Sequence, residues 1–474
     1  MGLDPHVTHS LIDIVGAAYV RRDPVDLEKY GRDALQIGHP ADLVVIPGST
    51  EEISRVARIC NESRTPLVVR GAGTGYTGGA VPILGGVVLS MKRFDRILDI
   101  DGDNLLAVVQ PNVITHVLQD AVEARGLFYP PDPASLKESS IGGNVAECAG
   151  GPRAVKYGTT RRYVLALEAV LPTGEIVRTG SKSVKSVVGY DLTQLLVGSE
   201  GTLAIITEVT LRLVPKPAVQ ATLRATFQDV TSAVNAVSAL LADRVTPATV
   251  ELIDRESLRA VERHLGRAIA AGADAMLIIE VDGVAGAVAE EADRVANACL
   301  SAGALDVQRA TTAEERTEIW EARRALSYAL RALAPRKINH DLVVPRGRVP
   351  ALFELVDRVR RQYRLLIPCF GHAGDGNIHV NLMVDPSDAD EMRRARDAER
   401  ELFEGVVRLE GSISGEHGIG FAKARYLGLE LTPEVIALMA RVKKAFDPNG
   451  ILNPGKMWEF QLESIAPDAR EQPS

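Results

Sequence analysis

The sequence lacks a long apolar run, an excess of basic residues and a cysteine cluster, and each absence argues against a class of protein. No apolar run reaches the roughly 20 residues that a membrane-spanning helix needs. The net charge of −8 argues against nucleic-acid binding and against a polybasic membrane anchor, because both require a basic excess. The four cysteines form no C-x-x-C pair, so neither an iron–sulfur cluster nor a cysteine-bound zinc site is expected.

The N-terminal segment MGLDPHVTHS also lacks the charged-then-apolar pattern of a signal peptide. We therefore expect a cytoplasmic protein, and a peripheral position on the inner face of the membrane stays open. The chain has 474 residues, of which 46% are hydrophobic and 24% charged, a composition typical of globular proteins. This length predicts two or three domains.

The order of strand and helix patterns predicts an α+β protein. A strand, a turn and a helix are expected over 40–63, where Ser49 and Glu52 fit a capping box. Strands dominate 159–215, and a domain boundary is expected near 215–217. Residues 218–310 predict strands and helices, with the helices on one face of a sheet. Long helices are expected over 311–333 and 387–410.

A glycine-rich loop, RGAGTGYTGGA (70–80), follows a strand of β-branched residues. It contains the pattern G-x-G-x-x-G, but Pro82 and another strand pattern follow it instead of a helix. A Rossmann dinucleotide site is therefore disfavoured, because that site needs a helix N-terminus directly after the glycines. Successive backbone N–H groups of such a loop can still form a nest for phosphate, although a flexible surface loop is the simpler alternative.

Two more glycine-rich segments lie beside predicted strands. One spans 129–160 and contains PPDP and IGGN, and the other is VGSEGTLAIIT (197–207). Three such loops suit a long ligand that carries phosphates and a flat ring system.

Two histidines, His372 and His379, flank an Asp-Gly turn in the segment GHAGDGNIHVN. Two imidazoles and a carboxylate are a common ligand set for zinc and similar divalent ions. Glu416, in SGEHGIG, is the candidate carboxylate, and His417 lies beside it. Histidines are more often plain hydrogen-bonded residues, but three in two glycine-rich loops favour a site.

The three glycine-rich segments, in this order, resemble the flavin-binding domain of vanillyl-alcohol oxidase-like and glycolate oxidase D-subunit-like enzymes. The resemblance implies a PCMH-type FAD-binding domain of two α+β subdomains at 1–216, with an N-terminal helical extension. It further implies a ferredoxin-like α+β substrate (cap) domain at 217–420 and a C-terminal segment at 421–474 that returns to the FAD domain. Some members bind FAD covalently through a loop histidine, and Thr74 and Tyr76 stand here instead, so noncovalent FAD is expected.

The resemblance places the FAD pyrophosphate on the first glycine-rich loop. The cofactor-binding residues that it implies are Arg70, Gly71, Ala72, Gly73, Thr74, Gly75, Gly78, Gly79, Pro131, Asp132, Ser135, Ile141, Gly142, Gly143, Asn144, Tyr157, Gly158, Glu200, Gly201, Ile205, Ile206 and Asn453.

The two C-terminal motifs resemble the (R)-2-hydroxy acid dehydrogenase branch of this family, which includes D-lactate, glycolate and D-2-hydroxyglutarate dehydrogenases. The resemblance implies that His372, His379 and Glu416 bind a divalent metal, with zinc, manganese or iron as options. By the same resemblance His417 is the catalytic base and Asn381 contacts substrate or metal.

Two cations are candidates for the substrate carboxylate. Arg323 matches the family's W-x-x-R arginine, whereas Arg324 is expected to be a solvated charge. Lys337 is the second candidate, because Asn339 stands where the D-2-hydroxyglutarate branch has a lysine, two residues before Asp341, and positions two apart share a strand face.

The resemblance thus implies FAD-dependent oxidation of a small (R)-2-hydroxy acid to the 2-oxo acid. Electrons would pass to an external acceptor: a quinone, an electron-transfer flavoprotein or an iron–sulfur subunit. Alternatives are glycolate or D-2-hydroxyglutarate oxidation, a flavin subunit of a larger glycolate oxidase, and a non-redox enzyme like alkylglycerone-phosphate synthase. No nucleic acid or transmembrane segment is expected, and a homodimer stays an option.

Overall fold

The computed structural model describes residues 2–458, which form two compact units. Among the described residues, unit 1 consists of 2–150, 159–216 and 416–458, and unit 2 of Gly151–Gly158 and Pro217–Gly415. The chain therefore passes between the units four times. No helix within 2–458 is both long and apolar enough to cross a membrane.

The first sheet of unit 1 has the strand order β1-β2-β4-β3, in which β2, β4 and β3 are parallel and β1 is antiparallel to β2. Ser49 caps α3, its hydroxyl accepting from the Glu52 N–H at 3.2 Å, while the Glu52 carboxylate accepts from the Gly48 N–H at 2.7 Å. The predicted helix start is confirmed. The elements are α1 (Pro5–Val15), β1 (Val20–Arg21), α2 (Pro24–Tyr30), β2 (Leu43–Val45), α3 (Thr50–Glu62), β3 (Leu67–Arg70) and β4 (Val87–Ser90).

The second sheet of unit 1 is antiparallel, with the order β5-β6-β10-β8-β9. The turn LPTGE (171–175) joins β8 and β9 as a hairpin, and Gly174 adopts a φ of +91° in it. The remaining elements of unit 1 are β5 (Ile97–Asp101), β6 (Leu106–Val109), α4 (Thr115–Glu123), β7 (Leu127–Phe128), α5 (Ile141–Glu147), β8 (Val164–Val170), β9 (Ile176–Gly180), α7 (Leu192–Leu196), β10 (Ile205–Arg212), β11 (Val214–Pro215), α14 (Leu427–Glu430) and α15 (Pro433–Phe446).

The glycine-rich segments differ in local structure. No helix follows the first loop, as predicted, since the next regular element is β4. The IGGN stretch, by contrast, is not a loop but the first turn of α5. Ser140 caps that helix, its hydroxyl accepting from the Gly143 N–H at 3.4 Å, so a capping serine outweighed two glycines.

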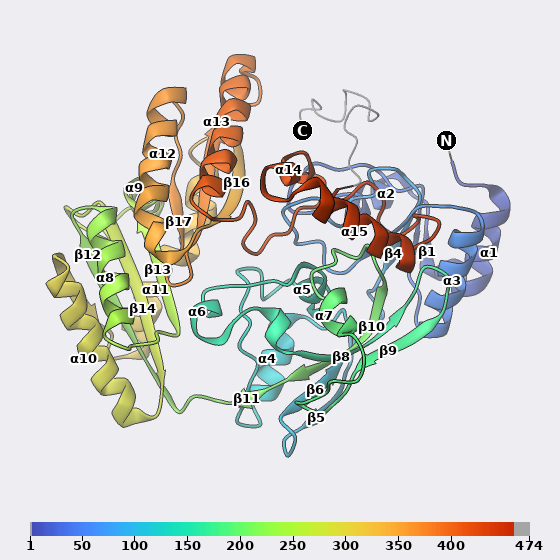
Figure 1. The fold of residues 1–474 in the computed structure, drawn as a ribbon, viewed down its shortest axis with the longest axis horizontal. Coiled ribbons are helices and arrows are strands. Elements are labelled where there is room, and N and C mark those ends of the chain that lie inside the picture. Colours follow the sequence, from blue (N-terminus) through green and yellow to red (C-terminus); the bar gives the residue numbers. More distant parts are fainter. Residues whose placement is uncertain (1, 459–474) are drawn as a thin grey trace. The chain divides into compact units, whose positions relative to one another are not determined.

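Unit 2 is built on a seven-stranded antiparallel sheet with the order β15-β12-β14-β13-β17-β18-β16 (Figure 1). Its elements are α6 (Ala154–Tyr157), β12 (Val219–Phe227), α8 (Val230–Ala242), β13 (Thr249–Asp254), α9 (Arg255–Leu265), β14 (Ala275–Gly283), α10 (Ala285–Ser301), β15 (Ala304–Arg309), α11 (Ala313–Arg331), β16 (Arg336–Val343), α12 (Val349–Tyr363), β17 (Cys369–His372), β18 (Asn377–Val384) and α13 (Ala389–Arg408).

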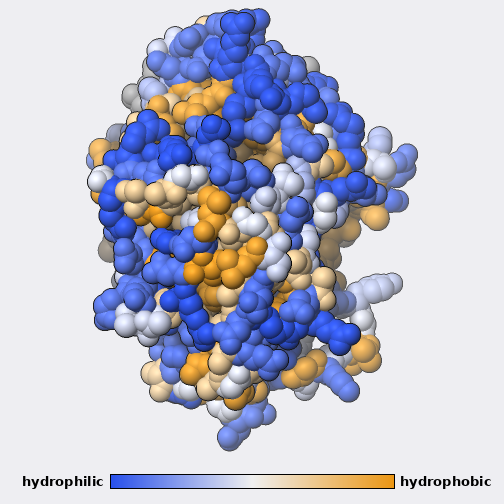
Figure 2. Space-filling model, turned by 90° about the vertical axis from the view of Figure 1, so that its left-hand side faces the viewer, coloured by the Kyte–Doolittle hydropathy of each residue, from blue (hydrophilic) through white to orange (hydrophobic). Residues whose placement is uncertain are grey.

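Helices cover both faces of this sheet, so the prediction of helices on one face over 218–310 is wrong. α9 and α11 pack on the face that carries Ile253, Met276 and Ile278. α8, α10, α12 and α13 lie on the opposite face (Figure 1). Figure 2 views the left-hand side of Figure 1 and shows a mainly hydrophilic surface with hydrophobic residues gathered in places.

Candidate functional site

The β17–β18 hairpin carries both predicted imidazole ligands. His372 ends β17, and the Gly376 N–H donates to its carbonyl oxygen at 3.1 Å to close the turn. Gly371 must be glycine, because a Cβ atom there would lie 2.5 Å from the Asn377 carbonyl oxygen. Gly376 has a φ of +89°, in the left-handed region that glycine tolerates. The glycines of the motif thus fold the chain back, as predicted, and bring His379 beside His372.

The strand register directs these side chains to one face of the sheet. Phe370 lies opposite His379, and Glu251 of β13 lies opposite His372. The two imidazole rings meet edge to face, with centroids 5.3 Å apart.

The predicted third ligand, Glu416, directly follows Gly415, the last residue of unit 2. Donor atoms of His372, His379 and Glu416 all lie within 4.8 Å of one another. Two imidazoles and one carboxylate at this spacing can hold a divalent cation.

Glu251 is a central residue of this site that the sequence analysis missed. It is completely buried, and its carboxylate binds both Nδ1 of His372 and Nε of Arg323. Burial raises the pKa of this carboxyl, but the charges of His372 and Arg323 outweigh burial and lower it below its usual range. The only sequence signal is one acidic residue within the otherwise buried strand TVELID.

Arg323 and Lys337, the predicted substrate cations, lie on elements that meet this face. The Arg323 guanidinium of α11 lies 4.8 Å from the centre of the Phe370 ring. Burial, with the charges of Arg331 and Arg323, lowers the pKa of Lys337 to about 8. Lys337 is therefore a cation that titrates close to neutral pH.

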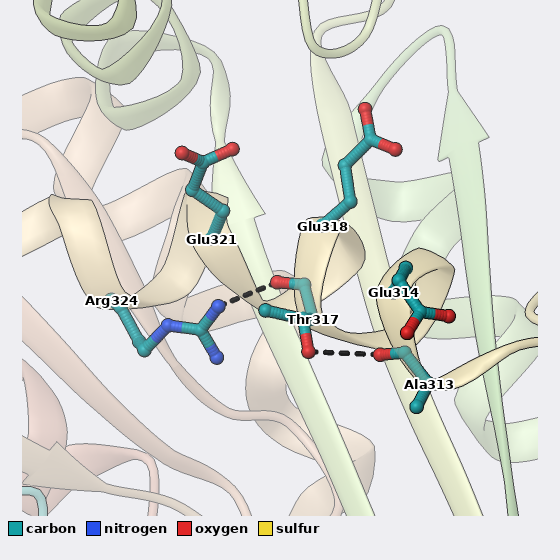
Figure 3. Close-up of a pocket in the computed structure, with 6 residues that line it drawn as sticks. All are labelled: Ala313, Glu314, Thr317, Glu318, Glu321 and Arg324. Carbon is teal, nitrogen blue, oxygen red and sulfur yellow. Dashed lines mark hydrogen bonds between the residues drawn. The ribbon is translucent and has the colours of Figure 1, made fainter.

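Arg324 points elsewhere, as predicted. It is exposed, and its guanidinium donates to the Thr317 carbonyl oxygen at 2.5 Å. Figure 3 shows it at the edge of an open hollow on α11, lined by Ala313, Glu314, Thr317, Glu318 and Glu321.

Asn381, the predicted substrate or metal contact, is fully buried in β18. Its Oδ1 accepts from the Asn339 amide at 2.7 Å, and its Nδ2 donates to the Pro368 carbonyl oxygen at 3.1 Å. Its amide thus joins β16 to β18 and fixes the segment that leads into β17.

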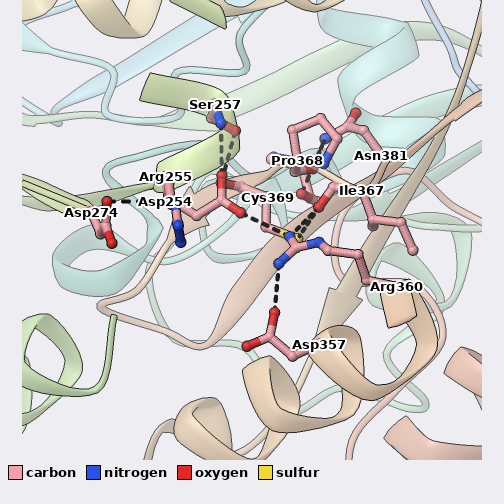
Figure 4. Close-up of polar contacts among 11 residues, drawn as sticks. Asp254, Arg255, Ser257, Asp274, Asp357, Arg360, Ile367, Pro368, Cys369 and Asn381 are labelled. Atoms are coloured by element: carbon pink, nitrogen blue, oxygen red, sulfur yellow. Dashed lines mark hydrogen bonds and ion pairs between the residues drawn. The ribbon is translucent and has the colours of Figure 1, made fainter. Parts of the chain in front are cut away.

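An ion pair between the partly buried Arg360 and the buried Asp254 supports the start of β17 (Figure 4). Arg360 lies 3.3 Å from the Asp254 carboxylate and donates to the Ile367 carbonyl oxygen at 2.5 Å. Asp254 also accepts from the Ser257 N–H at 2.9 Å, and the Ser257 hydroxyl donates to the Cys369 carbonyl oxygen at 3.0 Å. Burial raises the pKa of Asp254 to about 6 against the opposing charge of Arg360.

His417 lies in a loop of unit 1 that packs against the first glycine-rich loop. Its ring stacks on Tyr76 with centroids 5.2 Å apart, and its carbonyl oxygen accepts from the Thr77 hydroxyl at 3.1 Å. Both oxygens of the buried Glu200 accept backbone N–H groups at 2.7 Å, one from Ile419 and one from Gly420. The Glu200 side chain, predicted to bind cofactor, thus positions the His417 loop.

The C-terminal segment predicted to return to the FAD domain contacts this loop through NPGKM (453–457). The Asn453 amide donates to the carbonyl oxygens of Gly79, at 2.9 Å, and Glu200, at 2.7 Å. The Lys456 ammonium donates to the Val81 carbonyl oxygen at 2.6 Å and to Asn453 Oδ1 at 2.9 Å. The structure therefore brings together four motifs that are far apart in the sequence. The sequence analysis named Asn453 but missed Lys456, three residues further on.

Most residues predicted to bind FAD lie in unit 1, but Tyr157 and Gly158 do not. They belong to the short segment 151–158 of unit 2. The Tyr157 hydroxyl donates to Asp282 at 2.7 Å, and the Lys156 ammonium donates to the same carboxylate at 2.5 Å. The contacts of Asp282 thus fasten this segment to the end of β14.

The first glycine-rich loop fits the pyrophosphate of a dinucleotide. Gly73 and Gly78 have φ values of +75° and +79°, so side chains there would be strained. A Cβ atom at Gly75 would meet only the Asp33 carboxylate, at 3.8 Å. The backbone at Gly75 is therefore accessible to a bulky anion.

Two protein families match the chain. The family described as "FAD binding domain" matches residues 41–180, and "FAD linked oxidases, C-terminal domain" matches residues 216–457. "Glycolate oxidase subunit GlcD" of Bacillus subtilis is 46% identical over 91% of this chain and 90% of its own length. "D-lactate dehydrogenase" of Anaerostipes hadrus is 36% identical over 88% of this chain and 89% of its own length.

Solved structures agree on the fold. p-Cresol methylhydroxylase superposes with a TM-score of 0.80 at 18% identity, covering 97% of both chains. Alkyldihydroxyacetonephosphate synthase gives a TM-score of 0.75 at 19% identity, covering 95% of this chain and 86% of its own. At such identities the likeness shows the fold alone, and it confirms the predicted vanillyl-alcohol oxidase-like α+β architecture.

Proposed function

Because the chain belongs to the family of FAD-linked oxidases, we propose that it oxidises an (R)-2-hydroxy acid such as D-lactate to the 2-oxo acid. The observation that carries the proposal is the buried Glu251, which joins His372 to Arg323. One carboxylate thereby orients a candidate metal ligand and a candidate carboxylate-binding cation on the same face of a sheet.

The imidazole of His372 is suited to bind a cation through Nε2. Because Nδ1 donates to the Glu251 carboxylate, Nε2 is the nitrogen that would coordinate a cation, which would displace any proton from it. His379 and Glu416 supply the other donors. A divalent cation, with zinc, manganese or iron as options, would polarise the substrate hydroxyl and carboxylate as a Lewis acid.

The substrate carboxylate would bind Arg323 and Lys337. Arginine offers a planar pair of donors for a carboxylate, and Lys337 adds a charge that depends on pH. Asn381 would act by keeping β18 and the segment before β17 in place, since its amide already bonds Asn339 and Pro368.

His417 would accept the proton of the substrate hydroxyl as the C–H bond breaks. The hydrogen bond from the Thr77 hydroxyl to its backbone carbonyl oxygen holds the His417 loop, and stacking on Tyr76 holds the ring beside the first glycine-rich loop. When bound, FAD would accept the hydride from the substrate carbon. The products are then the 2-oxo acid, the reduced cofactor and one proton on His417.

The electrons must leave through a second molecule. All four cysteines are free thiols, well separated in the sequence, and no cluster of them could hold iron and sulfur within residues 2–458. An iron–sulfur subunit, a quinone or an electron-transfer flavoprotein would serve, and the name "subunit" of one relative favours a multi-subunit glycolate oxidase as an alternative.

Other substrates and one other reaction class are alternatives. Glycolate fits the same machinery, whereas D-2-hydroxyglutarate would rely on Lys337 for its second carboxylate, because Asn339 is neutral. A non-redox reaction like that of alkylglycerone-phosphate synthases is disfavoured by the three closely spaced metal donors.

The test is the visible spectrum of the purified protein under anaerobic conditions. D-Lactate, glycolate, D-2-hydroxyglutarate and D-mandelate are added in turn. Bleaching of the flavin band by one of them would support the reaction class and rank the substrates. A flavin that none of them bleaches, in metal-replete protein, would contradict the proposal.

Two substitutions separate the roles. His417→Ala should keep the flavin spectrum and lose reduction by substrate, and normal turnover would remove the base assignment.

His379→Ala should lose bound metal. The matched control is His340→Ala, which removes an equally buried imidazole that contacts Phe403 on the opposite face of the sheet and should retain metal.

A further inference from the structure

The segment 30–36, which follows α2 and leads toward β2, packs against the first glycine-rich loop. The Ala34 N–H donates to the Gly75 carbonyl oxygen at 3.0 Å. The Arg70 guanidinium donates to the Arg32 carbonyl oxygen at 2.5 Å and lies 5.8 Å from the centre of the Tyr30 ring. Arg70 is thus engaged with this segment, and the segment supports the loop from one side.

Asp33 directs a carboxylate at the loop. It is 5% exposed, and its Oδ1 accepts from the Leu35 N–H at 3.0 Å. Its Oδ2 is buried and has no hydrogen-bond partner within residues 2–458. That oxygen lies 3.8 Å from where a Cβ of Gly75 would stand. A buried polar atom without a partner is costly, so a role toward a ligand is the simplest reason to keep it.

We propose that Asp33 is part of the FAD site and takes up a proton when the cofactor binds. Asp33 lies outside residues 41–180, which match the FAD binding domain. The inference rests on the proposed placement of the pyrophosphate on the first glycine-rich loop. It is independent of the metal and the substrate.

The proton follows from charge. A pyrophosphate on this loop would bring a second anion beside a buried carboxylate, and like charges disfavour ionisation. Protonation converts Oδ2 from an acceptor that repels phosphate into a donor that can bond to it. The free-energy cost of protonating Asp33 near neutral pH is small, because burial has already raised the pKa of its carboxyl to about 6.

The charged and N–H groups around Asp33 lower its pKa, whereas burial raises it. The hydrogen bond from the Leu35 N–H lowers its pKa, as do the charges of Arg70 and Lys456 and, least of all, the nearby Gly78 N–H, which makes no hydrogen bond to Oδ2. Tyr30 interacts with Arg70. A bound pyrophosphate would share these cations and N–H groups, so they would stabilise the ionised form of Asp33 less.

Linkage fixes the sign of the pH effect. A carboxyl whose pKa is higher in the FAD complex than in the FAD-free protein favours binding fully at low pH. That contribution is lost as the pH rises from about 6 through the pKa of the complex. The dissociation constant for FAD should therefore rise by up to about tenfold per pH unit above pH 6.

The experiment uses the full-length chain after removal of FAD. Flavin fluorescence gives the dissociation constant between pH 6 and 8.5, and calorimetry in two buffers of different ionisation enthalpy counts protons. We expect net uptake at pH 7.5. Absence of uptake by the wild-type protein would overturn the inference without any variant.

Asp33→Asn mimics the protonated carboxyl. It should lose most of the proton uptake, reduce the pH dependence and bind FAD more tightly than the wild type at pH 8. A pH slope and proton uptake equal to the wild type would overturn the inference. Glu28→Gln, an exposed substitution in the preceding helix, is the matched control and should behave as the wild type. Any contribution from His417 is common to all three proteins.

One further variant separates this inference from its premise. Gly75→Val places a branched side chain on the accessible side of the loop and should weaken FAD binding at every pH. Normal FAD binding by Gly75→Val would refute the placement of the pyrophosphate. Bleaching of the flavin by substrate tests the proposed reaction and is unaffected by this result.

Discussion

Among single residues, Glu251 has the clearest consequence. Glu251→Gln keeps the shape of the side chain but removes the charge that orients His372 and pairs with Arg323. Loss of such an outer-shell carboxylate costs about 10- to 100-fold in metal affinity. We expect a loss in this range, measured by competition with a chelating dye.

The control for Glu251→Gln lies on the next strand of the same sheet. Glu280 is also buried, and it accepts from the Thr222 hydroxyl at 2.6 Å and from the Trp320 indole at 2.8 Å. Glu280→Gln should leave metal affinity unchanged. Equal losses in both variants would point to general damage of the sheet and contradict the specific role of Glu251.

Lys337 predicts a pH dependence of substrate binding. Its pKa of about 8 means that the ammonium is charged below that pH and neutral above it. A carboxylate substrate prefers the charged form, so KM should rise as the pH passes 8, by up to about tenfold per unit. Lys337→Arg keeps its charge and should flatten the profile. An unchanged rise in that variant would exclude Lys337 as its cause.

The site residues that the sequence predicts differ in their local sequence from the site residues that only the structure shows. His372, His379, Glu416 and His417 stand in glycine-rich motifs, where unusual composition marks them. Glu251, Lys456 and Asp33 act through long-range contacts, and their local sequence resembles ordinary strand, turn and helix-end segments. Such pairings arise from strand register and loop packing, which local patterns do not encode.

At the scale of elements, β17 and the start of α9 depend on the ion pair of the buried Asp254 with Arg360. Asp254→Ala removes both the helix cap and the buried partner of this ion pair, whose arginine side chain is a quarter exposed. The free energy of unfolding should fall by about 3–5 kcal/mol. Urea denaturation followed by circular dichroism measures this change.

Asp357→Ala is the matched control, because Asp357 pairs with the same guanidinium but is 55% exposed. An exposed pair contributes about 1 kcal/mol or less. A loss of stability as large as that of Asp254→Ala would contradict the assignment of the effect to burial.

Elements were predicted best where local signals agree. The cap of α3 and the long helices α11 and α13 follow from propensity and capping residues. The helix α5 was missed because its glycines suggested a loop. The placement of helices on both faces of the unit 2 sheet was also missed, because periodicity shows that a helix has a buried side but not which face of the sheet it covers.

For the whole molecule, the two units predict separate responses to cofactor. The first glycine-rich loop, Glu200 and Asn453 all belong to unit 1. FAD at 100 times its dissociation constant should stabilise unit 1 by about 2.7 kcal/mol. Amide hydrogen exchange should slow in the core strands of unit 1 and change little in β12 and β14, two strands of unit 2. Equal protection throughout would show that the units unfold together.

The three-part construction of unit 1 also has a consequence during synthesis. Domains fold as they leave the ribosome, from the N-terminus onward. Residues 217–415 emerge before Asn453 and Lys456, which complete the cradle around Gly79 and Val81. Unit 2 can thus form its sheet on the ribosome before Asn453 and Lys456 emerge. Termination between residues 415 and 453 would therefore leave a folded unit 2 on a chain whose first glycine-rich segment lacks the contacts of Asn453 with Gly79 and of Lys456 with Val81.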